Sequence, residues 1–168
     1  MRHLCRRHAL GLLAVGGAAL LLGGCGEEDT GPVDVHWDRD SCELCRMIIS
    51  DPRFTAQVRG GPKHKPYKFD DIGCAINWLN DKPWAGDPKT EIWVAERTST
   101  RTELKWLNAR DARYLNGEMT PMNYGFGAVA ADDPSARSKS YSFEQVADKI
   151  LENTPNHICR PSGAKPIG

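Results

Sequence analysis

Sulfur-bearing side chains gather in two short segments of this 168-residue chain. The first, residues 42–47, reads CELCRM, and the second, residues 119–122, reads MTPM. Thiolate and thioether ligands together select Cu(I), a soft ion that accepts two or three ligands, whereas Zn(II) and harder ions seldom bind methionine. His36, six residues before Cys42, could add an imidazole ligand. The pattern therefore favours a copper site built from these segments.

The same residues allow other interpretations. Methionine often fills gaps in hydrophobic cores, and this alternative stays open for all three methionines of the two segments. In an exported chain, Cys42 and Cys45 could form a small disulfide loop, or Cys74 and Cys159 could pair elsewhere. Either outcome would make the cysteines structural.

Redox and zinc chemistry are less well supported. A thioredoxin-type Cys-x-x-Cys pair should open a helix that follows a strand, because the helix N-terminus lowers the thiol pKa. Residues 46–49 (RMII) indicate a strand instead. A zinc site would need two further ligands, and Cys74 with His157 or Cys159 offers no second paired spacing. Cys74 is interpreted as a small buried hydrophobic residue, and His64, between two lysines, is expected in solvent.

An internal repeat indicates how the sulfur segments are positioned. Residues 65–72 (KPYKFDDI) and 139–146 (KSYSFEQV) share the pattern Lys-x-Tyr-x-Phe-acid-x-branched, and Ile76 and Ile150 extend the match at the same offset of 74 residues (139 − 65). Two structurally similar halves are implied.

The same offset relates the two sulfur segments to each other. Adding 74 to the position of Cys45 gives 119, and adding it to that of Met47 gives 121, one short of Met122. The segments therefore lie at equivalent points of the two halves. If the halves pack about a pseudo-twofold axis, the segments can converge on a shared site.

Each half is expected to run from a strand with a Tyr-x-Phe end into a helix. Apolar residues at helical spacing predict helices over residues 71–79 and 143–151. Asp70 or Asp71 can cap the first helix, and Ser142 with Gln145 forms a capping box for the second. Further strands are expected over residues 55–59, 91–97 and 127–131, and a short helix over residues 108–115. The fold class is α+β, with two related small ββα-type units packed as a pseudo-symmetric pair.

Composition adds few functional clues. The chain has 22 basic and 22 acidic side chains, which gives no indication of a nucleic-acid partner. Residues 1–24 contain three Arg and no acid, so the remaining 144 residues are mildly acidic (19 basic against 22 acidic). A body of that length buries roughly two thirds of its unfolded surface without a metal or disulfide staple. No Ser-His-Asp set, phosphate-binding Gly loop or carboxylate pair stands out, so we do not expect an enzyme.

The N-terminal segment has the layout of an export signal. A basic start precedes 14 apolar or small residues over positions 9–22, too few to span a bilayer comfortably, and the segment ends in Leu-Gly-Gly-Cys25. This ending resembles the bacterial lipobox, in which the cysteine is diacylated and becomes the new N-terminus. We expect residues 1–24 to be a lipoprotein signal peptide, Cys25 to be the lipidation site, and residues 25–40 to be a lipid-anchored tether.

Three separated motifs resemble one family. Residues 42–54 (CELCRMIISDPRF), 67–74 (YKFDDIGC) and 120–122 (TPM) occur in the order found in the NosL family, the nitrous oxide reductase accessory lipoproteins. The resemblance covers roughly residues 42–151. It implies a lipid-anchored Cu(I) chaperone that helps deliver copper to the copper-sulfide centre of nitrous oxide reductase, working with a membrane transporter and its periplasmic partner. It also implies two related ββα-like units.

The resemblance carries a ligand set onto this chain. The copper-binding Cys and Met of a Cys-Gly-Met segment correspond to Cys45 and Met47, and the Met after a Pro corresponds to Met122. Cys42 is taken as an auxiliary ligand, and His36 as a further candidate. The chain departs from the family by placing Arg46 where Gly is usual. If that Gly has a positive φ, Arg46 is strained.

These inferences combine into one prediction. Residues 41–152 form a NosL-like copper-binding domain with repeats at about 41–98 and 99–152, and residues 153–168 form a tail. The domain is held on a membrane, faces the periplasm or extracytoplasmic space, and carries Cu(I). The alternatives are an exported thiol-disulfide oxidoreductase that uses the Cys-x-x-Cys pair and an interaction lipoprotein with structural disulfides.

Overall fold

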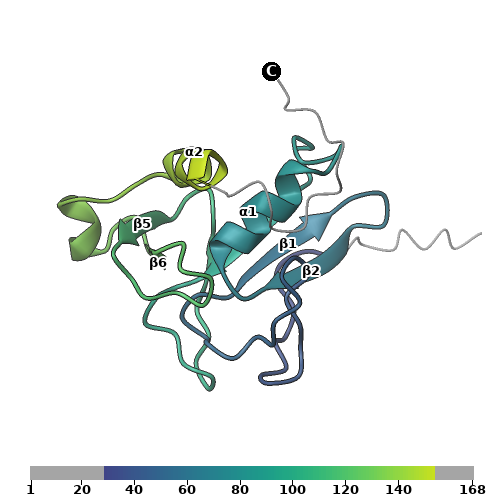
Figure 1. Cartoon of the computed structure of the whole chain (residues 1–168), viewed down its shortest axis with the longest axis horizontal. Helices are drawn as coiled ribbons and strands as arrows, with labels where there is room; N and C mark the ends of the chain where they lie inside the picture. Colours follow the sequence, from purple (N-terminus) through teal and green to yellow (C-terminus); the bar gives the residue numbers. More distant parts are fainter. Residues whose placement is uncertain (1–28, 154–168) are drawn as a thin grey trace, which may run out of the picture.

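The computed structural model describes residues 29–153, which form an α+β fold with two sheets and two helices (Figure 1). The expected signal peptide, the lipidation site Cys25, His157, Cys159 and the tail after Asn153 lie outside the described residues. Within residues 29–153, no helix is long and apolar enough to cross a membrane.

The larger sheet is antiparallel and has the strand order β2-β1-β3-β4. All residues of the central strand β1 are buried, because it has a neighbour on each side and α1 packs against it. Val58 of β1 pairs with Tyr67 of β2 and with Ile92 of β3, which sets the register. The strands are β1 (Ala56–Gly60), β2 (Lys65–Phe69), β3 (Glu91–Ala95) and β4 (Trp106–Asn108).

The smaller sheet is an antiparallel pair, β5 (Arg113–Asn116) with β6 (Phe126–Val129). It is joined to the larger sheet beyond the end of β3, where Arg97 N–H donates to the Ala128 carbonyl at 2.8 Å. A short 3₁₀ helix, η1 (Pro134–Arg137), follows β6.

Helix α1 (Ile72–Asn80) begins directly after β2 and lies across β1 and β2 (Figure 1). Asp71 is its N-cap, and its side chain accepts a hydrogen bond from Gly73 N–H at 2.9 Å. Seven of the nine helix residues are buried, because the sheet covers one side and α2 contacts the other. The expected helix over residues 71–79 is therefore confirmed, with Asp71 as its cap.

Helix α2 (Phe143–Asn153) packs on α1 and β5. Its N-terminus has the expected capping box: Gln145 N–H donates to Ser142 Oγ at 3.3 Å, and Ser142 N–H donates to Gln145 Oε1 at 2.9 Å. Only Val146 and Ile150 are buried, so one apolar stripe fixes the helix to the fold.

The two repeat motifs fold differently at their aromatic ends. Phe69 is the last residue of β2, whereas Phe143 is the first residue of α2. Tyr67 pairs within a five-residue strand, but Tyr141 makes only an isolated bridge with Tyr114. The helices therefore match the repeat more closely than the strands before them.

The helix expected over residues 108–115 is wrong. Asn108 ends β4, a turn closed by Ala112 N–H to the Asn108 carbonyl (3.0 Å) follows, and Arg113 begins β5. Tyr114 is fully buried and its hydroxyl donates to the Ala109 carbonyl at 2.8 Å. Pairing with β6 and burial of this ring outweigh the weak local helix preference of the segment.

Gly31 and Val33, in the middle of the expected tether, are hydrogen-bonded to the larger sheet. The Gln57 side chain makes two hydrogen bonds with the Val33 backbone: Oε1 accepts from the Val33 N–H at 2.8 Å, and Nε2 donates to the Val33 carbonyl at 2.7 Å. Gly31 N–H donates to Glu91 at 2.7 Å.

His64 is not in solvent, although the sequence suggested that it would be. Its side chain is only 14% exposed, and its Nε2 lies 3.1 Å from a Glu91 carboxylate oxygen, so the expectation is wrong.

Candidate metal centre

Four possible ligand side chains converge where β2 meets α1. The sulfur atoms of Cys42, Cys45 and Cys74 and a carboxylate oxygen of Asp70 all lie within 4.8 Å of one another. We call these four residues the cysteine cluster. They come from three segments: the loop before β1, the residue after β2, and the first turn of α1.

The loop that carries Cys42 and Cys45 is a tight turn. Cys42 N–H donates to the Met47 carbonyl at 2.8 Å, and Arg46 N–H donates to the Cys42 carbonyl at 3.0 Å. Glu43 N–H donates to the carbonyl of Lys68 in β2 at 2.8 Å, which fixes the turn to the sheet. The turn therefore presents both thiols toward the start of α1.

Residues 46–49 do not form the strand that the sequence indicates. The stretch has one bridged residue, Ile48, which pairs with Ser41 across the turn. Arg46 has a φ of 66°, the left-handed conformation that favours glycine, so the strain expected at this position is present. The short turn requires this conformation, and extended pairing cannot continue through it.

Asp70 and Cys74 complete the cluster from the other side. Asp70 is buried and accepts from Cys45 Sγ at 3.4 Å and 3.6 Å through its two oxygens. Cys74 lies in the first turn of α1, where its N–H donates to the Asp71 carbonyl at 3.0 Å. The positive end of the helix dipole favours negative charge at this position.

The three thiols do not ionise alike. A hydrogen bond from Cys74 lowers the pKa of Cys42 to about 7. Burial raises the pKa of Cys45 to about 12, and the pKa of Cys74 is raised because its proton is shared with Cys42 and because it is buried. Three thiolates and a carboxylate this close repel one another, so a bound cation is needed to hold all of them in the ionised form.

Access to the cluster is from the side of Cys45. Cys42 and Cys74 are completely buried, and Asp70 nearly so, whereas Cys45 is partly exposed. All three cysteines are free thiols, so the described residues hold no disulfide between Cys42 and Cys45. An incoming ion would meet the Cys45 sulfur first.

Among the described residues, none of the three methionines, Met47, Met119 and Met122, is fully buried. Met47 is 51% exposed on the turn after Cys45, and Met119 is 87% exposed, so neither fills the core. Met122 is half-buried, and its N–H donates to Asp71 Oδ2 at 3.4 Å, next to the start of α1. The structure therefore brings the segment of Met122 to the helix end that carries Cys74.

His36 stands apart from the cysteine cluster. The exposed His36 ring has its Nδ1 3.5 Å from Asp40 Oδ2, and the His36 backbone N–H donates to the same oxygen at 2.8 Å. Sequence reasoning missed Asp70 as a ligand candidate and assigned Cys74 to the core. The sequence did contain a signal for both residues: acidic side chains stand directly before a predicted helix, and a cysteine lies in the first turn of that helix.

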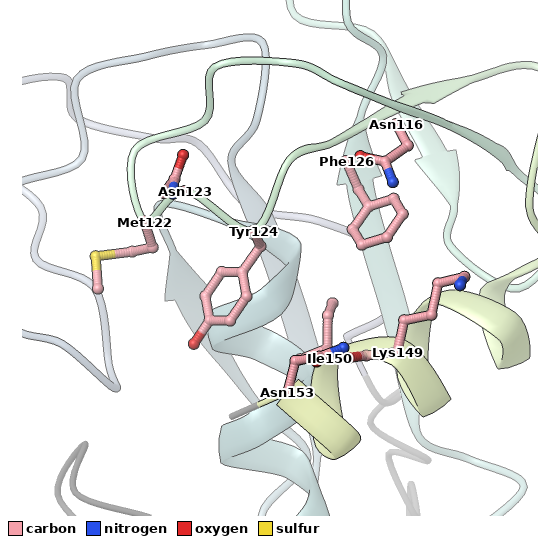
Figure 2. A pocket seen from close by; sticks show the side chains of 8 residues that line it. All are labelled: Asn116, Met122, Asn123, Tyr124, Phe126, Lys149, Ile150 and Asn153. Carbon is pink, nitrogen blue, oxygen red and sulfur yellow. Dashed lines mark hydrogen bonds between the residues drawn. The ribbon is translucent and has the colours of Figure 1, made fainter. Parts of the chain in front are cut away.

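A cavity of about 520 Å³ lies on the other side of Met122, between the β5–β6 sheet and α2. Figure 2 shows the Tyr124 ring inside it, between Met122 and Ile150, with the Met122 sulfur pointing away from that ring. Burial raises the pKa of Tyr124 beyond its usual range, and Cys74 and Asp71 act on it in the same direction. The Tyr124 ring therefore lines the cavity and is close enough to Cys74 and Asp71 for their charges to act on it.

The fold and the cluster define a small α+β domain with a cysteine-rich site that could bind a metal. No protein-family model matches the sequence, and no curated protein matches it. Two solved chains do match in structure.

One of them is the copper chaperone NosL from Shewanella denitrificans, whose crystal structure is similar to this chain with a TM-score of 0.51. The match covers 71% of this chain and 96% of that chain at 20% sequence identity. The chain therefore has a NosL-like fold, as the sequence motifs predict. It resembles a protein described as a chaperone rather than as an enzyme.

Proposed function

We propose that the chain is an exported, membrane-anchored Cu(I) chaperone that delivers copper for assembly of the copper-sulfide centre of nitrous oxide reductase. The observation that supports this most is the convergence of three cysteines and Asp70 within 4.8 Å in a fold like that of a copper chaperone. A chaperone needs a site that binds a soft ion and yet releases it. The partly exposed Cys45 beside buried partners meets both needs.

In this proposal Cys45 is the central ligand, with Met47 and Met122 as thioether ligands. Cys42, the auxiliary ligand expected from the sequence, and Cys74 would be further thiolates, and Asp70 would be the neighbouring carboxylate, because their ligand atoms lie within 4.8 Å of one another and of the Cys45 sulfur. Thiolates dominate the binding energy because they are the anionic soft ligands, whereas the thioethers favour Cu(I) over harder ions.

Zinc is the competing ion, because three thiolates and a carboxylate also suit tetrahedral Zn(II). The sequence offers no second paired spacing for zinc, but Asp70 and Cys74 lie close enough to Cys42 and Cys45 to complete a set of four ligands. The thioethers of Met47, which follows Cys45, and of Met122, whose N–H contacts Asp71, would favour Cu(I). Competition between the two ions for one chain separates these candidates.

The cellular parts of the proposal come from the sequence. A diacylated Cys25 would hold the domain on a membrane, facing the periplasm or extracytoplasmic space. Nitrous oxide reductase and its periplasmic and transporter maturation complex would be the partners. The pseudo-symmetric relation of the two halves belongs to the proposal too, supported by the offset of 74 residues and by the contact between α1 and α2.

Replacing Cys25 by Ser should release the protein from the membrane fraction without loss of copper affinity.

The test is an anaerobic Cu(I) titration of the whole chain against a competing chelator. We expect saturation at about one ion per chain, near-complete loss of tight binding in Cys45→Ser, and wild-type binding in the matched control Met119→Leu, since Met119 is exposed. No tight Cu(I) binding by the wild-type chain would refute the proposal, and preference for Zn(II) would replace it.

The structure gives less support to a thiol-disulfide oxidoreductase. Cys42 and Cys45 lie in a turn rather than at the start of a helix, and Cys42 is completely buried. A redox enzyme needs a thiolate that reaches its substrate. Failure to reduce an insulin-type disulfide substrate would distinguish the chaperone from this alternative.

A further inference from the structure

We infer that Asp71 and Tyr124 are positioning residues that hold the loop of residues 120–124, and with it the Met122 thioether, beside the cysteine cluster. The inference rests on the proposed function, because it concerns how a weak ligand of that site is kept in place. It concerns contacts behind the ligands, made by side chains that do not themselves bind the ion.

Asp71 joins the helix of Cys74 to the loop of Met122. Its side chain is completely buried beside Asp70. One carboxylate oxygen accepts from Gly73 N–H at 2.9 Å, and the other accepts from Met122 N–H at 3.4 Å. The Thr120 side chain also hydrogen-bonds this carboxylate. The Asp71 carboxylate therefore accepts hydrogen bonds both from the start of α1 and from the loop of Met122.

Tyr124 fixes the other end of the loop to the same helix. A Cβ added to Gly73 would lie 2.2 Å from the Tyr124 ring, so the ring packs directly against the helix backbone. Asn77 Nδ2 donates to the Tyr124 hydroxyl at 3.1 Å and to the Gly73 carbonyl at 2.9 Å. Sliding the loop along α1 would break these contacts together.

The loop itself is a compact turn with Met122 near its tip. Asn123 N–H donates to the Thr120 carbonyl at 3.0 Å, and Gly125 N–H donates to Thr120 Oγ1 at 3.2 Å. Asn123 has a φ of 59°, a conformation that asparagine tolerates better than most residues. Both ends of the turn are thus attached to α1, and the Met122 backbone has little freedom relative to Cys74.

A thioether needs such support more than a thiolate does. It is neutral and binds weakly, and ordering a long flexible methionine side chain costs entropy. Holding the backbone in place in advance reduces that cost, which is how residues behind metal ligands commonly act. Asp71 and Tyr124 provide this support on either side of Met122 in the sequence.

Helix capping explains the hydrogen bond from Gly73 N–H to Asp71, but it does not explain the hydrogen bond from Met122 N–H to Asp71. Asparagine is as good an N-cap as aspartate, so Asp71→Asn should preserve the hydrogen bond to Gly73 N–H. It replaces the second oxygen by an amide donor, which cannot accept from Met122 N–H. The variant therefore separates helix capping from attachment of the loop.

The experiment follows the methionine methyl groups of the full chain, labelled with ¹³C, as one equivalent of Cu(I) is added anaerobically. In the wild type we expect the Met122 signal to shift and the Met119 signal, the internal control, to stay in place. In Asp71→Asn and in Tyr124→Leu, the Met122 shift should be strongly reduced. Cu(I) should remain bound through the cysteines, with affinity lower by about tenfold.

Wild-type Met122 shifts in both variants would overturn the inference and leave Asp71 with a capping role only. Tyr124→Leu keeps the test open if Asp71→Asn does not fold, which circular dichroism reports. An unshifted Met122 signal in the wild type, with binding still lost in Cys45→Ser, would overturn the inference and remove Met122 from the ligand set, but Cu(I) binding by the cysteines, and with it the chaperone proposal, would stand. No Cu(I) binding by the wild type would overturn both.

Discussion

At the scale of single residues, Arg46 shows strain in the turn that carries Cys42 and Cys45. Glycine adopts a φ of 66° at little cost, whereas arginine does not, and the exposed Arg46 side chain makes only a loose contact with Glu43 (3.6 Å). The strain lies in the turn that places Cys42 and Cys45.

Arg46→Gly should therefore stabilise the protein slightly. Release of roughly 1–2 kcal/mol of backbone strain is offset by about 0.5–1 kcal/mol of extra chain entropy in the unfolded state, so we expect a gain of about 0.5–1 kcal/mol in the free energy of unfolding. Urea denaturation measures it. Asn123→Gly, at a φ of 59°, is the matched control and should gain less, because asparagine tolerates this conformation. A loss of stability in Arg46→Gly would contradict the account.

Copper binding should weaken as the pH falls. The pKa of Cys42 is lowered to about 7 and that of Cys45 is raised to about 12, so Cys45 is protonated in the free protein at pH 8 while Cys42 is largely ionised. The pKa of Cys74 is raised as well, so binding by all three thiolates at pH 8 should release one proton from Cys45 and one from Cys74, and below pH 7 a further proton competes for Cys42. Chelator competition at pH 6, 7 and 8 should show a steeper loss of affinity at the lower end. An affinity independent of pH would show that the thiols are not ligands.

The sequence predicted part of the site at this scale. Cys42 and Cys45 are recognisable because their spacing is local. Asp70 was considered as a helix cap, and Cys74 was interpreted mainly as a core residue. What makes them ligand candidates is a turn 25 or more residues away in the chain that folds back onto them. Such a contact depends on the packing of the loop on β2.

At the scale of elements, α1 is the part on which the site depends. It carries Cys74, receives Asp71 as its cap and contacts the loop of Met122 through Gly73. Helix and cap were predictable because apolar spacing and capping chemistry are encoded locally. The segment over residues 108–115 was not, because its strand pairing with β6 is encoded elsewhere in the chain.

Gly73→Ala tests the close packing of α1 against Tyr124. Alanine favours helix by up to about 1 kcal/mol, but its Cβ would lie 2.2 Å from the ring, so Tyr124 must move. We expect a net destabilisation of about 1–3 kcal/mol, measured by denaturant unfolding. Gly86→Ala is the control, because a Cβ there meets nothing within 4 Å, and its effect should stay within about 0.5 kcal/mol. Equal effects of the two substitutions would mean that the helix and loop are not tightly packed.

At the scale of the whole molecule, a bound ion would connect two parts of the chain that lie 25 or more residues apart. The cysteine cluster joins the loop before β1, the end of β2 and the start of α1. The α+β class and the order of most elements followed from the sequence, whereas the pseudo-symmetric packing of two halves remains a prediction. The first Tyr-x-Phe motif lies in the strand β2, whereas the second makes only one bridge. The two halves therefore differ most at these motifs.

Cu(I) should raise the thermal stability of the domain. An ion that binds only the folded chain adds about 2.7 kcal/mol at a free concentration 100 times its Kd, which corresponds to a rise of several degrees in Tm. Anaerobic differential scanning calorimetry with buffered Cu(I) measures this. Cys45→Ser should show no such rise, whereas Met119→Leu should behave as the wild type. A rise that persists in Cys45→Ser would mean that the ion binds elsewhere.

The central claim is that the cysteine cluster holds Cu(I), and X-ray absorption at the copper edge of the chain loaded with one equivalent tests it most directly. We expect a first coordination shell dominated by sulfur, unchanged in His36→Ala and diminished in Cys45→Ser. A shell dominated by nitrogen or oxygen, or one that His36→Ala alters and Cys45→Ser does not, would contradict the assignment of the ion to these cysteines.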